Sequence, residues 1–113
     1  MIQKTETKTI INQSVQRIKN NLHPEKIILF GSYAYGNPRH TSDIDILIVK
    51  DVKKNEIRKY RIMAKQTLRD IMLKNDIDID VIIDSWERIQ ERISIGDLFM
   101  KEIIEKGKVI YGK

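Results

Sequence analysis

The sequence predicts an α/β (α+β) domain in which helices pack against a small mixed β-sheet. Two apolar runs, IILF at residues 27–30 and ILIV at residues 46–49, flank a polar loop, which is typical of two strands of one sheet. Apolar residues recur at three- and four-residue steps before and after this unit, which indicates amphipathic helices that cover the sheet. At 113 residues, we expect one domain, residues 1–113, around a single core.

The composition excludes several classes of protein. Hydrophobic residues make up 41% and charged residues 33% of the chain, a balance that favours a folded domain over disorder. The absence of cysteine excludes disulfides, thiolate zinc sites and a cysteine nucleophile. No apolar run approaches the roughly 20 residues of a membrane helix, and the N-terminal segment MIQKTETKTI lacks the apolar core of a signal peptide. We therefore expect a cytoplasmic protein.

The first half of the chain predicts a helix, a strand and a single helical turn. The helix covers residues 7–22 and ends before Pro24, because the residue before a proline is disfavoured in the helical region. His23 is then a loop residue that we expect to be exposed rather than catalytic. A strand follows at residues 26–30, and residues 32–36 form one helical turn. The apolar face of the helix consists of Ile10, Ile11, Val15, Ile18 and Leu22.

The second half predicts a long helix, an acidic strand and a closing helical segment. The helix covers residues 55–73, and Asn75 stops it from continuing. Residues 76–84, DIDIDVIID, alternate carboxylates with apolar residues, which indicates a strand with one acidic face. One helix or two short ones follow, ended by Gly107, before a short strand at residues 109–111. Their apolar positions are Ile89, Ile93, Ile95, Leu98, Phe99, Ile103 and Ile104.

Asp43 and Asp45 are the first candidate site residues. They flank Ile44 at the start of the second apolar run, and strand geometry places both carboxylates on one face. Two like charges held side by side repel each other, and a divalent cation such as Mg²⁺ removes the conflict. Gly31-Ser32 follows the preceding strand, where glycine lets the backbone approach a ligand and exposed N–H groups favour an anion. The pattern predicts a nucleoside triphosphate bound through metal.

Two other motifs compete at the same residues. Carboxylates in the segment 76–87 match positions 1, 3, 5, 9 and 12 of an EF-hand loop, but the sixth position, normally glycine, is Val81, which favours the strand. The spacing of Gly31 and Gly36 resembles a P-loop, but Asn37-Pro38 stands where that motif requires Lys-Ser/Thr. Both alternatives are therefore disfavoured.

The excess of positive charge, a net +5 with a pI of about 9.5, suits an anionic partner or substrate. Much of it lies in residues 50–65, where a solvated helix face is favoured over a binding patch. In the polar loop, Arg39 and His40 could contact a phosphate or a base, although such loop residues are usually solvated. Aromatic residues make up only 6% of the chain, so direct binding of nucleic acid is not expected.

Gly31-Ser32, ten intervening residues and Asp43-Ile44-Asp45 resemble the GS-x10-DxD signature of the nucleotidyltransferase superfamily, whose fold is shared with DNA polymerase β. The short chain resembles the minimal (MNT) branch, and the likeness extends over most of its length. The resemblance implies a polymerase β palm-like fold. It also implies attack of an acceptor hydroxyl on the α-phosphate of a nucleoside triphosphate, with release of pyrophosphate.

The resemblance also implies roles for named residues. Asp43, Asp45 and a third carboxylate from the acidic strand would hold two Mg²⁺ ions and carry catalysis, with ATP as the substrate. Asp80 is the expected third carboxylate, and Asp78, which shares its face, is the alternative. Gly31 and Ser32 would bind the terminal phosphates of the nucleotide.

Minimal members of this superfamily serve as MntA-type antitoxins of HEPN–MNT toxin–antitoxin pairs, in which the MNT protein transfers AMP to a tyrosine of the HEPN toxin. The resemblance therefore implies protein adenylyltransferase activity (AMPylation) on a HEPN-type toxin encoded nearby. Two alternatives stay open: transfer to a small molecule such as an antibiotic, in a cleft that a homo-oligomer would build, and a non-catalytic antitoxin that uses this fold only for binding.

Overall fold

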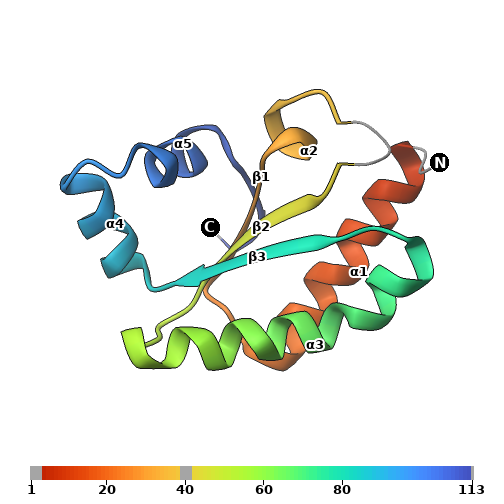
Figure 1. Cartoon of the computed structure of the whole chain (residues 1–113), viewed down its shortest axis with the longest axis horizontal. Helices are drawn as coiled ribbons and strands as arrows, with labels where there is room; N and C mark the ends of the chain where they lie inside the picture. The colour runs from red at the N-terminus through yellow and green to blue at the C-terminus, as the bar shows by residue number, and fades with distance from the viewer. Residues whose placement is uncertain (1–3, 39–41, 113) are drawn as a thin grey trace.

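A four-stranded β-sheet forms the centre of the fold (Figure 1). The computed structural model describes residues 4–38 and 42–112 of the chain. The strands are β1 (Lys26–Phe30), β2 (Ile44–Val49), β3 (Ile79–Asp84) and β4 (Lys108–Tyr111). They lie in the order β3-β2-β1-β4. β1 pairs antiparallel with β2 and β4, whereas β2 and β3 are parallel, so the sheet is mixed, as predicted.

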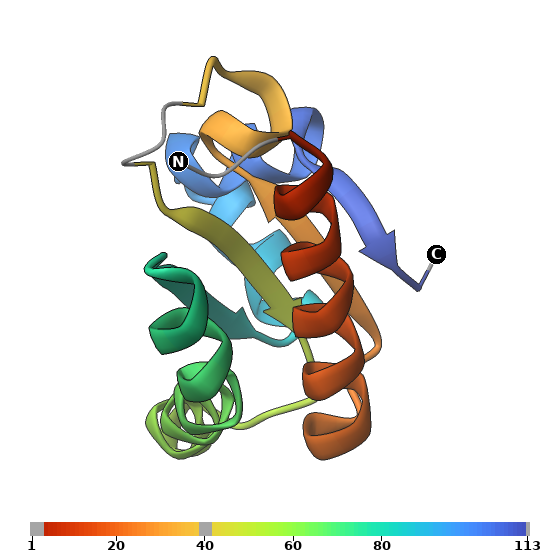
Figure 2. The same cartoon turned by 90° about the vertical axis from the view of Figure 1, so that its right-hand side faces the viewer.

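Helices cover both faces of this sheet (Figures 1 and 2). The long helices α1 (Lys4–Leu22) and α3 (Ile57–Asn75) pack on one face, and a short 3₁₀ turn at Lys54–Glu56 leads into α3. The short helices α4 (Trp86–Ser94) and α5 (Leu98–Lys106) pack on the other. A single turn, α2 (Ser32–Tyr35), follows β1 directly. The layers match the α/β class expected from the sequence.

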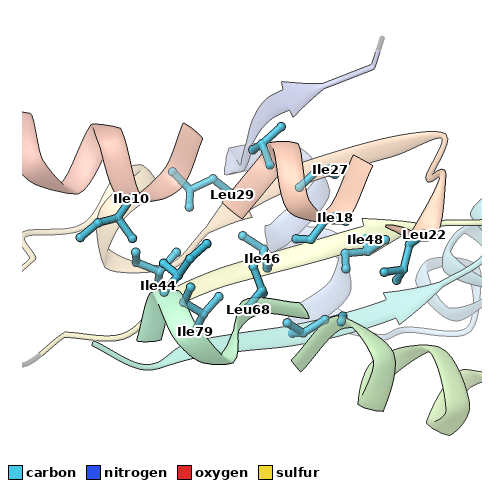
Figure 3. Packing of buried hydrophobic residues seen from close by; sticks show 14 of the residues in the cluster. Ile10, Ile18, Leu22, Ile27, Leu29, Ile44, Ile46, Ile48, Leu68 and Ile79 are labelled. Atoms are coloured by element: carbon cyan, nitrogen blue, oxygen red, sulfur yellow. The ribbon is translucent and has the colours of Figure 1, made fainter. Parts of the chain in front are cut away.

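Strand alternation divides the sheet residues between two cores. Ile44, Ile46 and Ile48 of β2 face α1 and α3, where they pack with apolar residues of those helices (Figure 3). The intervening Leu47 and Val49 face α4 and α5. Each such side chain contributes about 1.5–3 kcal/mol when fully buried. The central strands are therefore held from both faces, which fixes the positions of the polar residues at their ends.

A buried ion pair marks the end of β3. The Asp84 side chain is only 2% exposed, and it accepts hydrogen bonds from the Ser85 N–H and from Nε of Arg88 at 2.8 Å. Arg92 lies 3.5 Å from its second oxygen. Ser85 caps α4, because its hydroxyl accepts the N–H of Arg88 at 3.2 Å. Asp84 therefore holds α4 against the sheet and is not available as a ligand.

Most predicted elements are confirmed, with shifted ends. The first strand has the predicted bounds, and His23 is exposed, as expected. The acidic strand begins at Ile79 instead of residue 76, because Asp76 adopts a left-handed conformation (φ 49°) that ends α3. An extended strand at residues 79–84 also rules out the EF-hand loop. Arg39 and His40 lie outside the described residues.

The closing helical segment corrects one expectation. Ile95, Leu98 and Phe99 follow the apolar pattern of a buried face, but they are 79%, 75% and 53% exposed. Gly96 adopts a positive φ of 100° and ends α4, so these residues lie at the junction of two helices instead of along one. The two-helix alternative is the correct one. Within the described ranges, no helix is both long and apolar enough to cross a membrane.

The larger core generates a stability prediction. Leu68 of α3 is fully buried, whereas Leu73 on the same helix is 72% exposed. We expect Leu68→Ala to lower the free energy of unfolding by about 2–5 kcal/mol, because it removes buried methyl groups and leaves a cavity. Leu73→Ala, the same chemical change, should cost under about 0.5 kcal/mol. Urea denaturation measures both, and equal costs would contradict the described packing.

Candidate active site

Four aspartates gather at one end of the two parallel strands. Asp45 lies at the start of β2 and is paired in register with Asp80 of β3. Both are on the sheet face that carries α4 and α5, because each alternates with residues of the larger core. Asp43 precedes β2 by one residue and Asp78 precedes β3 by one residue. The parallel pairing therefore brings the two acidic segments together, as the family resemblance implied.

The carboxylate groups are close enough to share a ligand. Oxygens of Asp43, Asp78 and Asp80 all lie within 4.8 Å of one another, and all three residues are exposed. Asp45 is half-buried, and its carboxylate lies against Gly31 at the end of β1. The predicted residues Asp43, Asp45 and Asp80 thus converge beside the glycine-serine corner, and Asp78 joins them.

The crowding of negative charge changes the acidity of two carboxyl groups. Burial, followed by the charges of Asp80 and Asp43, raises the pKa of Asp45 to about 6. Burial and the charges of Asp80 and Asp78 also raise the pKa of Asp43, while Lys65 acts in the opposite direction. Both shifts have the direction expected for like charges held together. Neutral or metal-bound carboxyl groups therefore fit this cluster better than free anions.

Gly31 is required where it stands for two reasons. Its φ is +75°, in the left-handed region that residues with a side chain rarely adopt. In addition, a β-carbon at this position would overlap Oδ2 of Asp45. The corner between β1 and α2 is thus shaped around the Asp45 carboxylate. The predicted contact of Gly31 with a phosphate stays a prediction, and the structure shows a different close contact, with the Asp45 carboxylate.

Sequence reasoning missed Lys65 of α3. Its ammonium donates a hydrogen bond to the carbonyl oxygen of Ile79 at 2.6 Å and lies 3.5 Å from an Asp78 oxygen. In the sequence, Lys65 belongs to a run of cations that favours a solvated helix face. No signal in the sequence identifies it, because its place depends on how α3 packs against β3. Lys65 therefore neutralises part of the acidic cluster.

The donor set fits a hard divalent cation. The cluster offers only carboxylate oxygens, which Mg²⁺ prefers, and those of Asp43, Asp78 and Asp80 lie close enough together to hold one ion, while Asp45 lies outside this set of three. Burial and, after it, the charges of Asp80 and Asp43 raise the pKa of Asp45, and a bound cation would offset both effects. Among the residues that the structure describes, no other group of three such side chains has this proximity.

A glycine substitution tests the geometry of the corner. We expect Gly31→Ala to lower the free energy of unfolding by about 2–4 kcal/mol, from the strained φ together with overpacking against Asp45. Gly96→Ala is the matched control, because Gly96 has a φ of +100° but no atom within 4 Å of an added β-carbon. Its cost should be the backbone strain alone. In a double-mutant cycle, Asp45→Ala should recover part of the Gly31→Ala loss, and strict additivity would contradict the contact.

The shifted acidity predicts a pH dependence of stability without metal. Asp45 has a pKa of about 6 in the folded chain against the ordinary aspartate value of 3.8, so the folded state binds more protons between these two pH values. In EDTA, its contribution to stability should therefore fall as the pH rises from about 4 to about 6. Thermal unfolding of wild type and Asp45→Asn measures this. The variant should lose that component, and identical profiles would contradict the assignment.

Comparison with known proteins places the chain in a family. The family model described as Polymerase beta, Nucleotidyltransferase matches residues 12–113. A Methanocaldococcus jannaschii protein, MJ0604, provisionally named a protein adenylyltransferase, is 37% identical over 87 residues, which is 77% of this chain and 78% of that protein. A second protein of this organism with the same provisional name, MJ1215, is 41% identical over 44 residues, or 39% of this chain and 51% of that protein.

Solved structures show the same fold. A chain of a toxin–antitoxin crystal structure with AMP-PNP superimposes with a TM-score of 0.54 at 20% identity, covering 90% of this chain and 73% of that chain. A chain from the complex of a tri-AMPylated Shewanella oneidensis HEPN toxin with an MNT antitoxin gives a TM-score of 0.57 at 19% identity, covering 94% and 72%. Together with the family match, these findings confirm the predicted fold. The chain belongs to the Polymerase beta nucleotidyltransferase family and is a nucleotidyltransferase.

Proposed function

We propose that this nucleotidyltransferase is a Mg²⁺-dependent protein adenylyltransferase, the antitoxin of a HEPN–MNT pair, which acts in the cytoplasm as a single domain. It would transfer AMP from ATP to a hydroxyl, that of a tyrosine, on a HEPN-type toxin. The observation that carries the proposal is the convergence of Asp43, Asp45 and Asp80 beside Gly31. This arrangement gathers carboxylate oxygens where a metal-bound triphosphate and an acceptor hydroxyl can meet.

Asp43, Asp45 and Asp80 are the proposed metal-binding and catalytic residues. Bound Mg²⁺, in two ions, would neutralise the triphosphate and lower the pKa of the attacking hydroxyl. Asp80 is preferred to Asp78 as the third carboxylate, because Asp78 already has Lys65 beside it and accepts the N–H of Ile79 at 3.0 Å. No ion pair of Asp80 occurs in the described part of the chain, so its oxygens remain available as ligands and as a proton acceptor.

Gly31 and Ser32 are the proposed contacts to the terminal phosphates. The turn of α2 begins at Ser32, directly after the left-handed Gly31, and the first amides of a helical turn have no acceptor within it. In the reaction, the acceptor oxygen forms a bond to the α-phosphorus as the bond to pyrophosphate breaks, and the hydroxyl proton passes to a carboxylate or to water. Gly31 and Ser32 would hold the leaving group in line.

The protein acceptor is inferred from the relatives. The provisional name of MJ0604 describes transfer to a protein, and the complex from Shewanella oneidensis contains an AMPylated toxin bound to an MNT antitoxin. The open surface around the carboxylates supports this, since Asp43, Asp78 and Asp80 are all exposed. A large acceptor such as a folded protein could therefore reach them directly.

Labelled ATP tests the proposal. The chain is incubated with Mg²⁺, α-labelled ATP and the protein encoded by the adjacent reading frame. We expect label on that protein, and none when EDTA is added before the reaction. Asp43→Ala should reduce the labelling at least about 100-fold, because it removes a carboxylate that would bind the metal directly. Asp70→Ala is the control, because Asp70 pairs with Arg17 far along α3 and should leave transfer unchanged.

The same experiment separates the alternatives. If the neighbouring protein receives no label from wild type, or if Asp43→Ala labels it equally well, the proposal is wrong. A non-catalytic antitoxin would still neutralise its partner after Asp45→Asn, whereas an adenylyltransferase would not. Label that appears on an added small-molecule acceptor and not on the protein would instead favour an antibiotic-modifying type of enzyme.

A further inference from the structure

A basic groove opens beside Asp80 on the outer edge of the sheet. It has a volume of about 500 Å³ and lies between α3 and the edge strand β3. Arg61, Lys65 and Arg69 of α3 line it together with Ile62, Met72 and Asp80. Asp80 is thus common to the groove and to the acidic cluster. An occupant of the groove would therefore lie beside the acidic cluster, next to Lys65 and its neighbour Asp78.

The three cations form one row along α3. Their spacing of four residues places them on the same side of the helix, one turn apart. Lys65 is engaged with Ile79 and Asp78, but Arg61 and Arg69 are exposed and have no carboxylate partner among the described residues. Two arginines thus flank Lys65 with their guanidinium groups available to an external anion.

A second groove provides a comparison, because one of its cations pairs with a carboxylate of the same chain. It has a volume of about 420 Å³ between α1 and α3 and is lined by two cations, of which Arg17 is held by Asp70 in a two-armed pair at 2.7 and 2.8 Å and Lys74 is exposed. The groove beside Asp80 carries more positive charge and has no such internal partner for its arginines. These arginines are therefore available to an anion from outside the chain.

The groove is also apolar in part, which narrows the class of ligand. Ile62 is 44% exposed at its rim, and Met72 and Val81 add apolar surface to its lining. The triphosphate of the donor has its proposed site at Gly31 and Ser32, at the end of β1, two strands away from β3. A nucleic acid would gain little here, since the lining contains no aromatic side chain for base stacking.

We propose that this groove binds the acceptor segment of the partner protein, and that it selects a hydroxyl flanked by acidic residues and an apolar side chain. This inference rests on the proposed function and adds the substrate class to it. Carboxylates of the partner pair with Arg61 and Arg69, and an apolar side chain packs on Ile62. The acceptor hydroxyl is thereby placed at Asp80, on the opposite side of the cluster from the phosphate corner.

A pair of charge-reversal variants tests the proposal. The double variant Arg61→Glu/Arg69→Glu reverses the charge at the two arginine positions of the groove and leaves Lys65 in place. The control Lys59→Glu/Lys108→Glu makes the same change of charge at exposed positions outside the groove, on the far side of α3 and on β4. The measurements are the affinity of each for the protein of the adjacent reading frame, the KM for that protein and for ATP, and kcat.

We expect the groove variant to bind the partner protein at least about 10-fold more weakly and its KM for that protein to rise by at least about 10-fold. Its affinity should also depend less on salt concentration. Its kcat and its KM for ATP should stay within about twofold of wild type, because the carboxylates and the phosphate corner are untouched. The control should match wild type in all four. Replacing acidic residues near the acceptor hydroxyl by lysine should restore binding to the groove variant alone.

Other outcomes overturn the proposal. If the affinity and KM for the partner are unchanged, the groove has no role in binding it. A rise in the KM for ATP alone would assign the groove to the nucleotide. Loss of binding to a single-stranded RNA oligonucleotide alone would assign it to RNA. Affinity is also measured in the Asp45→Asn background, where transfer is absent. A groove effect that persists there supports the docking surface even if the chain transfers no AMP, so the two proposals fail separately.

Discussion

Repulsion among carboxylates at one corner of the sheet is the constraint on which the rest of the structure depends. Four aspartates stand at the starts of two parallel strands, and burial together with this repulsion raises the pKa of Asp45 to about 6. Such a cluster persists only where the surrounding fold supplies the energy to hold it. Gly31, which has no side chain, leaves room for the Asp45 carboxylate, and the ammonium group of Lys65 partly compensates the negative charge of Asp78. A divalent cation bound at this corner would reduce the repulsion that the fold otherwise has to offset.

The energy that holds the cluster comes from the two cores. The residues of β2 alternate between the faces, so Ile44 and Ile46 are buried against α1 and α3 while Leu47 is buried against α4 and α5. Shifting β2 by one residue would exchange these faces and move Asp45 into the larger core. Burial of a charged carboxylate costs several kcal/mol, so the hydrophobic pattern fixes the register and the register fixes the site.

Much of the fold and the core of the site could be predicted because they depend on local patterns. Alternation within one strand places Asp43 and Asp45 together, and the acidic run places Asp78 and Asp80 together. Joining the two pairs required knowing that β2 and β3 are parallel neighbours, which strand periodicity alone does not provide. Ile95 and Phe99 were misassigned for a related reason, because an apolar residue has the same pattern on a core face and at an exposed junction.

The sequence predicts a solvated helix face for the cations of residues 50–65, and the structure distinguishes the cations of α3 by what each one contacts. Lys65 donates a hydrogen bond to Ile79 of β3, and its positive charge acts to lower the pKa of Asp43 in the acidic cluster. Arg61 and Arg69, one turn to either side, line the groove and have no carboxylate partner among the described residues. A guanidinium has a fixed planar fork that suits a carboxylate, whereas an ammonium is a compact point charge. The distribution of residue types along the row therefore agrees with its division of roles, which no count of net charge could have revealed.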